Sequence, residues 1–187
     1  MRVLIVPGWS DSGPRHWQTV WERKNGYERL RQRDWVNPEV EEWTAALDAA
    51  VTAHAGDTVL VAHSLGCLTV AQWAASYRES AAQVKSALLV APFDAGSHPG
   101  CPRSMRRFAA KPTALPFPSV VVASENDHYG TLEFAEAAAR GWKSRLVNVG
   151  AAGHINVESG HGPWPEGERL LRDLVAGVKG SNWSLAS

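Results

Sequence analysis

A serine lies in what the sequence predicts to be a tight turn between a buried strand and a helix. Residues 59–62 (Val-Leu-Val-Ala) form a short apolar run, typical of a strand that is buried on both faces. Residues 68–75 then follow a helical pattern, so that Ser64 occupies the turn between the small residues Ala62 and Gly66. In such a turn, small residues let strand and helix approach closely, and the serine oxygen projects outward as a nucleophile. The alternative interpretation is that Ser64 is an ordinary N-cap of the helix.

The chain also offers the two other groups that acyl transfer by a serine requires, a base and an acid that orients the base. His154 follows Gly153 in a predicted loop, which leaves its imidazole free to reach across the site. Asp127 comes shortly after the predicted strand 118–123. The order along the chain is therefore serine, aspartate, histidine, which is the order found in α/β hydrolases.

Two main-chain amides are expected to stabilise the negative oxygen that forms when a serine attacks a carbonyl. The amide of Leu65 lies at the N-terminus of the predicted helix, where backbone N–H groups have no partner in the helix. The amide of Trp9 lies in the loop after the first predicted strand, which is expected to sit beside the serine turn. Together they form the predicted oxyanion hole.

Other residues compete for the roles of acid and base. Asp94 also follows a predicted strand and is the alternative acid. Glu125 is close to Asp127 in sequence but is expected to face away from it. The alternative bases are His63, His128 and His161. Because His63 directly precedes the serine, we expect its side chain to point away from the site.

The walls of a substrate pocket are harder to derive from the sequence. Four aromatic residues are candidates to shape an apolar acyl pocket: Trp9, Phe93, Tyr129 and Trp164. Residues 95–117 are the least regular part of the chain, rich in glycine and proline around a basic group. This segment is expected to be either a pocket wall or lid, or a solvated loop.

Strands alternate with helices along the chain, which predicts a parallel sheet covered by helices on both faces. Strands are predicted at residues 2–6, 27–31, 59–62, 85–90, 118–123 and 144–149. Helices are predicted at residues 15–24, from 38 to about 51, from 68 to about 78, at 131–141 and at 167–179. Since Ser64, Asp127 and His154 all come after strands, we expect them to meet at the carboxyl edge of this three-layer α/β fold.

Length and composition narrow the class of protein. The chain has 187 residues, with 19 Lys and Arg balanced by 19 Asp and Glu, so no nucleic-acid or anionic-membrane partner is expected. One domain is predicted over residues 1–180, followed by a tail at 181–187. The chain has two cysteines, Cys67 and Cys101, and their positions indicate neither a disulfide nor a metal site. No signal peptide or membrane span is predicted, so the expected location is the cytoplasm.

No metal or other cofactor is expected. The histidines lack the spacing of a zinc motif, and the chain has neither a GxGxxG fingerprint nor a P-loop. Acyl transfer by a serine needs none of these groups.

Short motifs along most of the chain point to a known family. They are Val6-Pro7-Gly8-Trp9, Arg15-His16-Trp17-Gln18, Asp34-Trp35, residues 61–66, residues 90–93, residues 124–127, Gly153-His154-Ile155-Asn156 and Trp164-Pro165-Glu166-Gly167. With these motifs the chain resembles the small serine hydrolases of the retinoblastoma-binding-protein-nine and YdeN-like type, within the α/β-hydrolase superfamily. The resemblance implies a compact hydrolase with a minimal cap or none, and Ser64, Asp127 and His154 as its catalytic triad.

The resulting hypothesis is a serine hydrolase that cleaves small carboxylic esters or amides through an acyl-enzyme intermediate. Its only predicted partner is this small-molecule substrate. The alternatives are a non-catalytic protein-binding module that kept the fold, and an acyltransferase. The pocket-protein motif Leu-x-Cys-x-Glu is incomplete here, because Thr69 stands where it requires Glu. No protein partner is therefore predicted.

Overall fold

A six-stranded parallel sheet forms the centre of the molecule. The computed structural model describes residues 1–54, 56–109 and 112–179, and within them the strand order is β2-β1-β3-β4-β5-β6. The strands are β1 (Arg2–Val6), β2 (Glu28–Arg29), β3 (Thr58–His63), β4 (Val84–Val90), β5 (Ser119–Ala123) and β6 (Arg145–Asn148). Every neighbouring pair is parallel, so all the carboxyl ends lie at one edge of the sheet.

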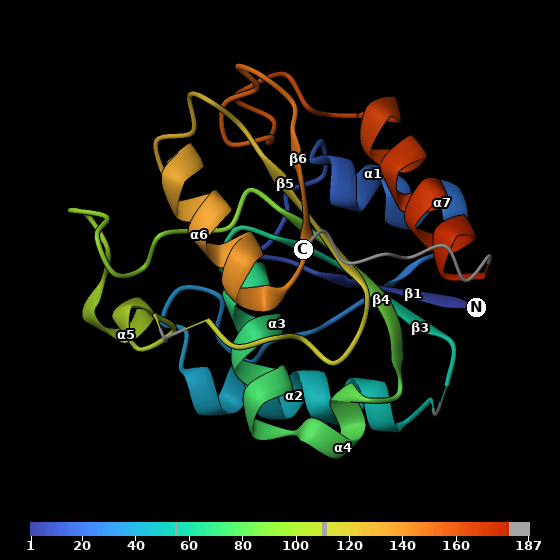
Figure 1. Ribbon diagram of the computed structural model, residues 1–187. Helices are drawn as coiled ribbons and strands as arrows, with labels where there is room; N and C mark the ends of the chain where they lie inside the picture. The colour runs from blue at the N-terminus through green and yellow to red at the C-terminus, as the bar shows by residue number, and fades with distance from the viewer. Residues whose placement is uncertain (55, 110–111, 180–187) are drawn as a thin grey trace.

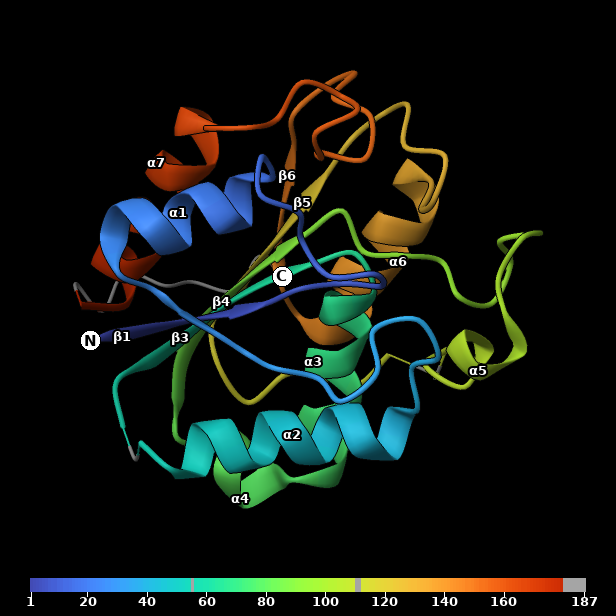
Figure 2. The same ribbon diagram turned by 180° about the vertical axis from the view of Figure 1, so that it is seen from behind.

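Helices cover both faces of this sheet. They are α1 (Trp17–Asn25), α2 (Val40–Thr52), α3 (Leu65–Ser76), α4 (Arg78–Ala81), α5 (Arg103–Arg106), α6 (Leu132–Trp142) and α7 (Pro165–Lys179). Helices α1 and α7 lie together on one face, and α2, α3 and α6 lie on the other (Figures 1 and 2). This arrangement confirms the predicted three-layer α/β-hydrolase fold.

The central strands contain uninterrupted apolar runs because both of their faces are buried. Val59 and Val61 of β3 pack into the core that contains the tryptophans of α1 and the leucines of α7. Their neighbours Leu60 and Ala62 point the other way, into the core formed with α2, α3 and α6. Successive residues of a strand face opposite sides, so an uninterrupted apolar run is what two covered faces require.

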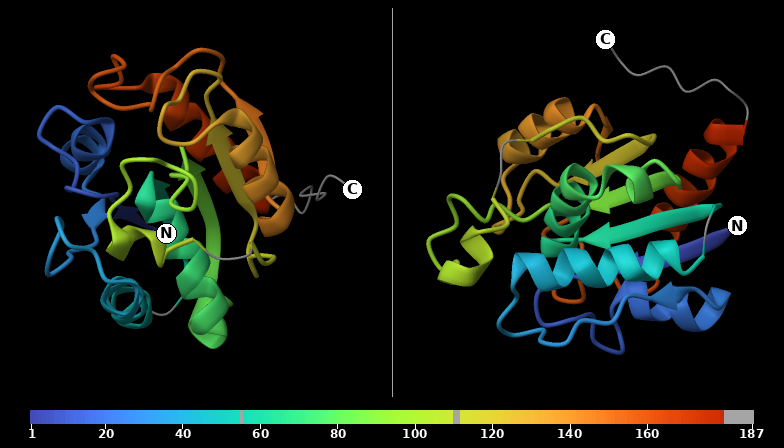
Figure 3. Two further views of the ribbon diagram at one scale, coloured as in Figure 1. Left: turned by 90° about the vertical axis from the view of Figure 1, so that its left-hand side faces the viewer. Right: turned by 90° about the horizontal axis from the view of Figure 1, so that it is seen from below.

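The direction of winding reverses at β1, which pairs with β2 on one side and β3 on the other. Val6 at the end of β1 is in register with Ala62 near the end of β3. The loop after β1 therefore meets the turn after β3, at the kind of switch point where α/β sheets bind ligands. Helix α5 lies beyond the carboxyl ends of the strands (Figure 3, right).

A few element boundaries differ from those predicted. The edge strand β2 has two residues rather than the predicted five, and these two, Glu28 and Arg29, lie in register with Leu4 and Ile5 of β1. Helix α3 ends at Ser76, and the short α4 follows a break at Tyr77, whose φ and ψ are −118° and 59°. The irregular segment 95–117 contains α5. The predicted tail at 181–187 lies outside the described residues.

Replacing Gly66 with alanine should destabilise the fold. A Cβ at Gly66 would lie 2.3 Å from the carbonyl oxygen of Val6 and 2.7 Å from that of Pro7. Since both atoms belong to the backbone, the strand or the helix must shift, at a cost of about 1–3 kcal/mol. Denaturant unfolding should show this loss for Gly66→Ala.

Gly13→Ala is the matched control, because nothing lies within 4 Å of the Cβ it would add. It should unfold like the original protein. Equal stability of the two variants would contradict the proposed close approach.

Candidate active site

The turn at Ser64 has an unusual backbone conformation. Ser64 connects β3 to α3 with φ 55° and ψ −124°, values that a non-glycine residue rarely adopts. Its amide donates a hydrogen bond of 3.0 Å to the carbonyl of Val90 in the neighbouring strand β4. Such strain persists only where the surroundings hold it, and it is concentrated at functional sites. The geometry is that of a nucleophile turn, and Ser64 makes no side-chain N-cap hydrogen bond.

Two glycines let the loop after β1 approach this turn. A Cβ at Gly8 would lie 2.9 Å from the Cβ of Ser64 and 3.2 Å from the amide nitrogen of Leu65. Gly66 allows an equally close approach on the helix side. The loop that carries Trp9 therefore lies directly beside the serine, as the sequence predicted.

His154 lies between Ser64 and Asp127 and contacts both. Its Nε2 is 2.9 Å from the Ser64 Oγ, and its Nδ1 is 2.8 and 3.0 Å from the two carboxylate oxygens of Asp127. A carboxylate only accepts hydrogen bonds, so Nδ1 carries the proton in the neutral ring and Nε2 is left to accept from the serine hydroxyl. The Asp127 side chain is only 2% exposed. The structure thus brings together the three residues that the sequence selected.

The loop before His154 is held by side chains that the sequence analysis did not single out. Asn126 Oδ1 accepts a 2.7 Å hydrogen bond from the amide of Gly153, and Ser124 Oγ accepts one of 2.9 Å from the amide of Ala152. Both side chains come from the loop that carries Asp127. The acid and the base are therefore connected by main-chain contacts as well as by their own side chains.

The rival acids do not reach the histidine. Asp94 Oδ1 accepts from the amides of Gly96 and Ser97, and so closes its own turn. Glu125 accepts from the side chain of Asn148 and, as expected, does not join Asp127 at the site. Asp94 and Asp127 both follow a strand in the sequence. Only the fold shows which of the two carboxylates contacts His154.

The expected orientation of His63 is wrong. Its ring lines the same cavity as Ser64, and its Nε2 lies 2.9 Å from the main-chain oxygen of His154. The reversal of the chain at Ser64 makes the alternation of a regular strand a poor guide at this position. His161, another rival base, instead contacts the hydroxyl of Ser159.

The oxyanion-donor roles of Leu65 and Trp9 stay predictions, and the structure shows where these two residues lie in the chain. Leu65 is the first residue of α3, so its amide is one of those without an intrahelical partner. Trp9 follows Gly8 in the loop against the serine turn. Its indole Nε1 donates a 2.8 Å hydrogen bond to the carbonyl of Val36, which anchors the side chain at the cavity mouth.

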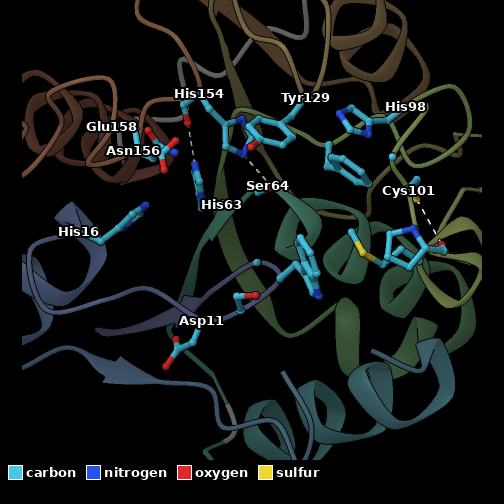
Figure 4. A pocket seen from close by; sticks show the side chains of 17 residues that line it. Asp11, His16, His63, Ser64, His98, Cys101, Tyr129, His154, Asn156 and Glu158 are labelled. Atoms are coloured by element: carbon cyan, nitrogen blue, oxygen red, sulfur yellow. Dashed lines mark hydrogen bonds between the residues drawn. The ribbon is translucent and has the colours of Figure 1, made fainter. Parts of the chain in front are cut away.

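A cavity of about 350 Å³ opens above Ser64 (Figure 4). Its lining includes the predicted residues Trp9, Phe93 and Tyr129 together with Cys101 and Met105, and Figure 4 shows Tyr129 and Cys101 on one side of Ser64. The other side is polar and includes Asp11, His16, Asn156 and Glu158. The serine lies between these two sides.

The irregular segment 95–117 supplies part of the cavity wall. Met105 is 2% exposed, and both it and Cys101 line the cavity. Phe108, at 1% exposed, packs against Trp43 of α2 with ring centroids 5.7 Å apart. Of the two interpretations of this segment, the structure supports a pocket wall, because buried side chains attach it to the core.

Trp164 is not part of the wall, and its predicted role in binding substrate is wrong. It is 5% exposed and stacks on Trp21 of α1 with ring centroids 5.8 Å apart and planes at 10°. It also packs against Trp17 at 5.1 Å. This aromatic cluster joins α1 to the start of α7 within the core.

Buried neutral histidines surround the base. Burial, with smaller contributions from His154, Arg29 and His161, lowers the pKa of His16 to about 3. Burial and the proximity of His154 and His16 also hold the pKa of His63 well below its ordinary value. Both rings are therefore uncharged at neutral pH and do not repel positive charge on His154.

The thiol nearest to the serine in sequence is not an activated nucleophile. Burial raises the pKa of the Cys67 thiol in α3, so this thiol stays protonated. Within residues 1–54, 56–109 and 112–179, no group of three or more His, Cys, Asp or Glu side chains is arranged to hold a metal ion.

Comparisons with known proteins identify the family and the fold. A family model described as serine hydrolase matches residues 3–173. A solved structure from Pectobacterium atrosepticum, described as that of a putative YdeN-like hydrolase, is 31% identical, with a TM-score of 0.82 over 95% of this chain and 91% of the other. The ydeN gene product of Bacillus subtilis is 22% identical, with a TM-score of 0.76 over 94% and 98%.

More distant structures share the fold. A thermophilic esterase from Thermogutta terrifontis is 16% identical, with a TM-score of 0.68 over 95% of this chain and 90% of the other. No curated protein matches the chain in a sequence comparison.

The chain belongs to the serine hydrolase family and is a hydrolytic enzyme with an α/β-hydrolase fold. The resemblance to YdeN-like hydrolases is thereby confirmed. A non-catalytic binding module is correspondingly disfavoured. None of the helices in the described part of the chain is long and apolar enough to cross a membrane; the cytoplasmic location stays a prediction.

Acid should destabilise the fold through its buried histidines. An unfolded histidine titrates near its ordinary pKa of 6.5, whereas folded His16 titrates only near 3. Between pH 6.5 and about 3 the unfolded chain binds more protons than the folded chain. The free energy of unfolding therefore decreases as the pH is lowered, by up to ~1.4 kcal/mol per pH unit for each such histidine. Thermal melts from neutral pH to about pH 4 should show this decline.

His16→Asn tests the cause. The His16 ring caps α1 by accepting a hydrogen bond from the Gln18 amide. Asparagine cannot titrate, but its side-chain oxygen can accept the same hydrogen bond. The variant should therefore lose stability less steeply in acid. A slope equal to that of the original protein would contradict the assignment to His16.

Proposed function

We propose that the enzyme hydrolyses small carboxylic esters or amides through an acyl-enzyme on Ser64. The observation that carries this proposal is the position of His154, whose two ring nitrogens lie within 3.0 Å of the Ser64 hydroxyl and the Asp127 carboxylate. This is the arrangement by which a serine is activated for attack on a carbonyl. Membership of the serine hydrolase family supports the same chemistry.

In the proposed reaction His154 Nε2 takes the proton of Ser64 as the Oγ attacks the carbonyl carbon. Asp127 holds the ring in the required tautomer and stabilises its protonated form. The amides of Leu65 and Trp9 donate to the carbonyl oxygen as it becomes negative, a contribution of roughly 3 kcal/mol for each donor. The protonated ring then gives its proton to the leaving alcohol or amine, and water releases the acyl group by the reverse path.

The cavity supports a small substrate with an apolar acyl group. A volume of about 350 Å³ is at the lower end of ordinary ligand pockets. Phe93, Met105 and Tyr129 offer an apolar surface for the acyl chain. A short, uncharged acyl ester such as p-nitrophenyl acetate or butyrate is therefore a suitable first assay substrate.

Replacing Ser64 with alanine should abolish ester hydrolysis without a large loss of thermal stability. A fluorophosphonate probe should label the original protein at Ser64, as mapped by peptide mass spectrometry. Ser97→Ala, which removes an exposed hydroxyl from a nearby loop, should be labelled normally. Esterase activity that survives in Ser64→Ala would refute the nucleophile.

Asp127→Asn should lower kcat by about 10⁴-fold, because an amide in place of the carboxylate favours the wrong tautomer of the base. Asp94→Asn is the matched control, since Asp94 accepts only from its own turn and should keep most activity. Steady-state kinetics on both variants distinguish them. The opposite ranking would assign the role of the acid to Asp94.

A further inference from the structure

The main chain around His154 is strained. Gly153 and Ile155, on either side of the base, have φ values of 58° and 47°. Glycine adopts this left-handed conformation easily, whereas for a β-branched residue such as Ile155 it is a genuine outlier. The loop would relax from this conformation unless its surroundings held it.

Two buried ring N–H groups hold this strained stretch through consecutive carbonyls. His63 Nε2 lies 2.9 Å from the main-chain oxygen of His154, a contact drawn as a dashed line in Figure 4. Trp17 Nε1 donates to the main-chain oxygen of Ile155, also at 2.9 Å. A carbonyl only accepts, so His63 carries its proton on Nε2. The two donor residues are 5% and 0% exposed, so both hydrogen bonds are largely shielded from solvent.

The hydrogen bond of His63 links the chain segment that carries His154 directly to the residue before Ser64. His63 is the last residue of β3 and the covalent neighbour of Ser64. Its ring also packs against the ring of His154, with centroids 4.8 Å apart. The hydrogen bond to the carbonyl therefore sets the distance between the two chain segments whose side chains must exchange a proton.

We propose that His63 is a positioning residue that keeps His154 within hydrogen-bond distance of Ser64 by donating from Nε2 to the main-chain carbonyl of His154. Trp17 has the same role at the next carbonyl. The inference rests on the proposed function, since it takes His154 as the base and Ser64 as the nucleophile. The ring of His63 is uncharged, so it can orient the base without opposing its protonation.

Two substitutions of His63 separate the N–H donor from simple packing. His63→Phe keeps a planar ring but removes the donor, and His63→Gln retains an N–H at a similar reach. Misplacing reacting groups by about 1 Å can cost about 10²-fold in rate, so we expect His63→Phe to lower kcat by up to about that factor. KM for p-nitrophenyl acetate should change little, and His63→Gln should recover most of the lost kcat.

Several results would overturn this role for His63. One is unchanged kcat in His63→Phe. Another is an equal loss in the Phe and Gln variants, which would make the effect one of packing. A change in KM alone would make His63 a substrate contact instead.

A second pair of variants tests the role of ring donors without touching His63. Trp17→Phe and Trp21→Phe remove the same N–H group from two tryptophans of one aromatic cluster, both 0% exposed. Trp21 donates to the carbonyl of Pro163, which lies shortly before α7 and apart in sequence from His154. We expect both variants to lose thermal stability, but only Trp17→Phe to lose kcat. An equal loss of kcat in the two would overturn the inference.

Fluorophosphonate labelling of the original protein separates this inference from the proposed function. If Ser64 is not labelled and ester hydrolysis is absent, the proposed function fails and the role of His63 fails with it. A different outcome is that Ser64 is labelled, His63→Phe has the kcat of the original protein, and Trp17→Phe has the kcat of Trp21→Phe. That outcome would refute only the positioning role.

Discussion

The site depends on one steric constraint, the close approach of the loop after β1 to the strained turn at Ser64. The two segments lie so close that only glycine fits at positions 8 and 66. A Cβ added at Gly8 or Gly66 would lie within 3.0 Å of existing atoms. That approach brings the Trp9 loop, the serine and the start of α3 into one small volume. A backbone with φ 55° at Ser64 persists there because the sheet and the helix fix the chain on both sides.

The electrostatics of the site follow from burial. A carboxylate that is 2% exposed is costly unless it is paired, and the Nδ1 of His154 and the amide of Tyr129 supply its partners. The neighbouring rings of His16 and His63 are held neutral by burial. In the proposed reaction, positive charge on His154 therefore faces the carboxylate of Asp127 without repulsion from the rings of His16 and His63. The same burial makes the fold sensitive to acid.

The loop that carries His154, between β6 and α7, has no regular secondary structure and is nevertheless held at several points. Side chains from the acid loop hold the amides before His154, and ring N–H groups from β3 and α1 hold the carbonyls at and after it. The two ring donors belong to β3 and α1, which are buried in the core, and the two acceptors belong to the loop that carries Asp127. The geometry of a loop residue is thus determined by the sheet and by helix α1, rather than by the local preferences of the loop.

The sequence by itself determined the layers of the fold and which residues to propose for the chemistry. Apolar runs specify strands buried on both faces, and parallel strands bring whatever follows them to one edge, so Ser64, Asp127 and His154 could be selected together. Only the tertiary structure decided where individual side chains point. Asp94 and Asp127 both come after strands, yet one closes a turn and the other meets the base. His63 turns into the site and Trp164 into the core, because local backbone angles and long-range packing set these directions, and neither can be read from residue spacing.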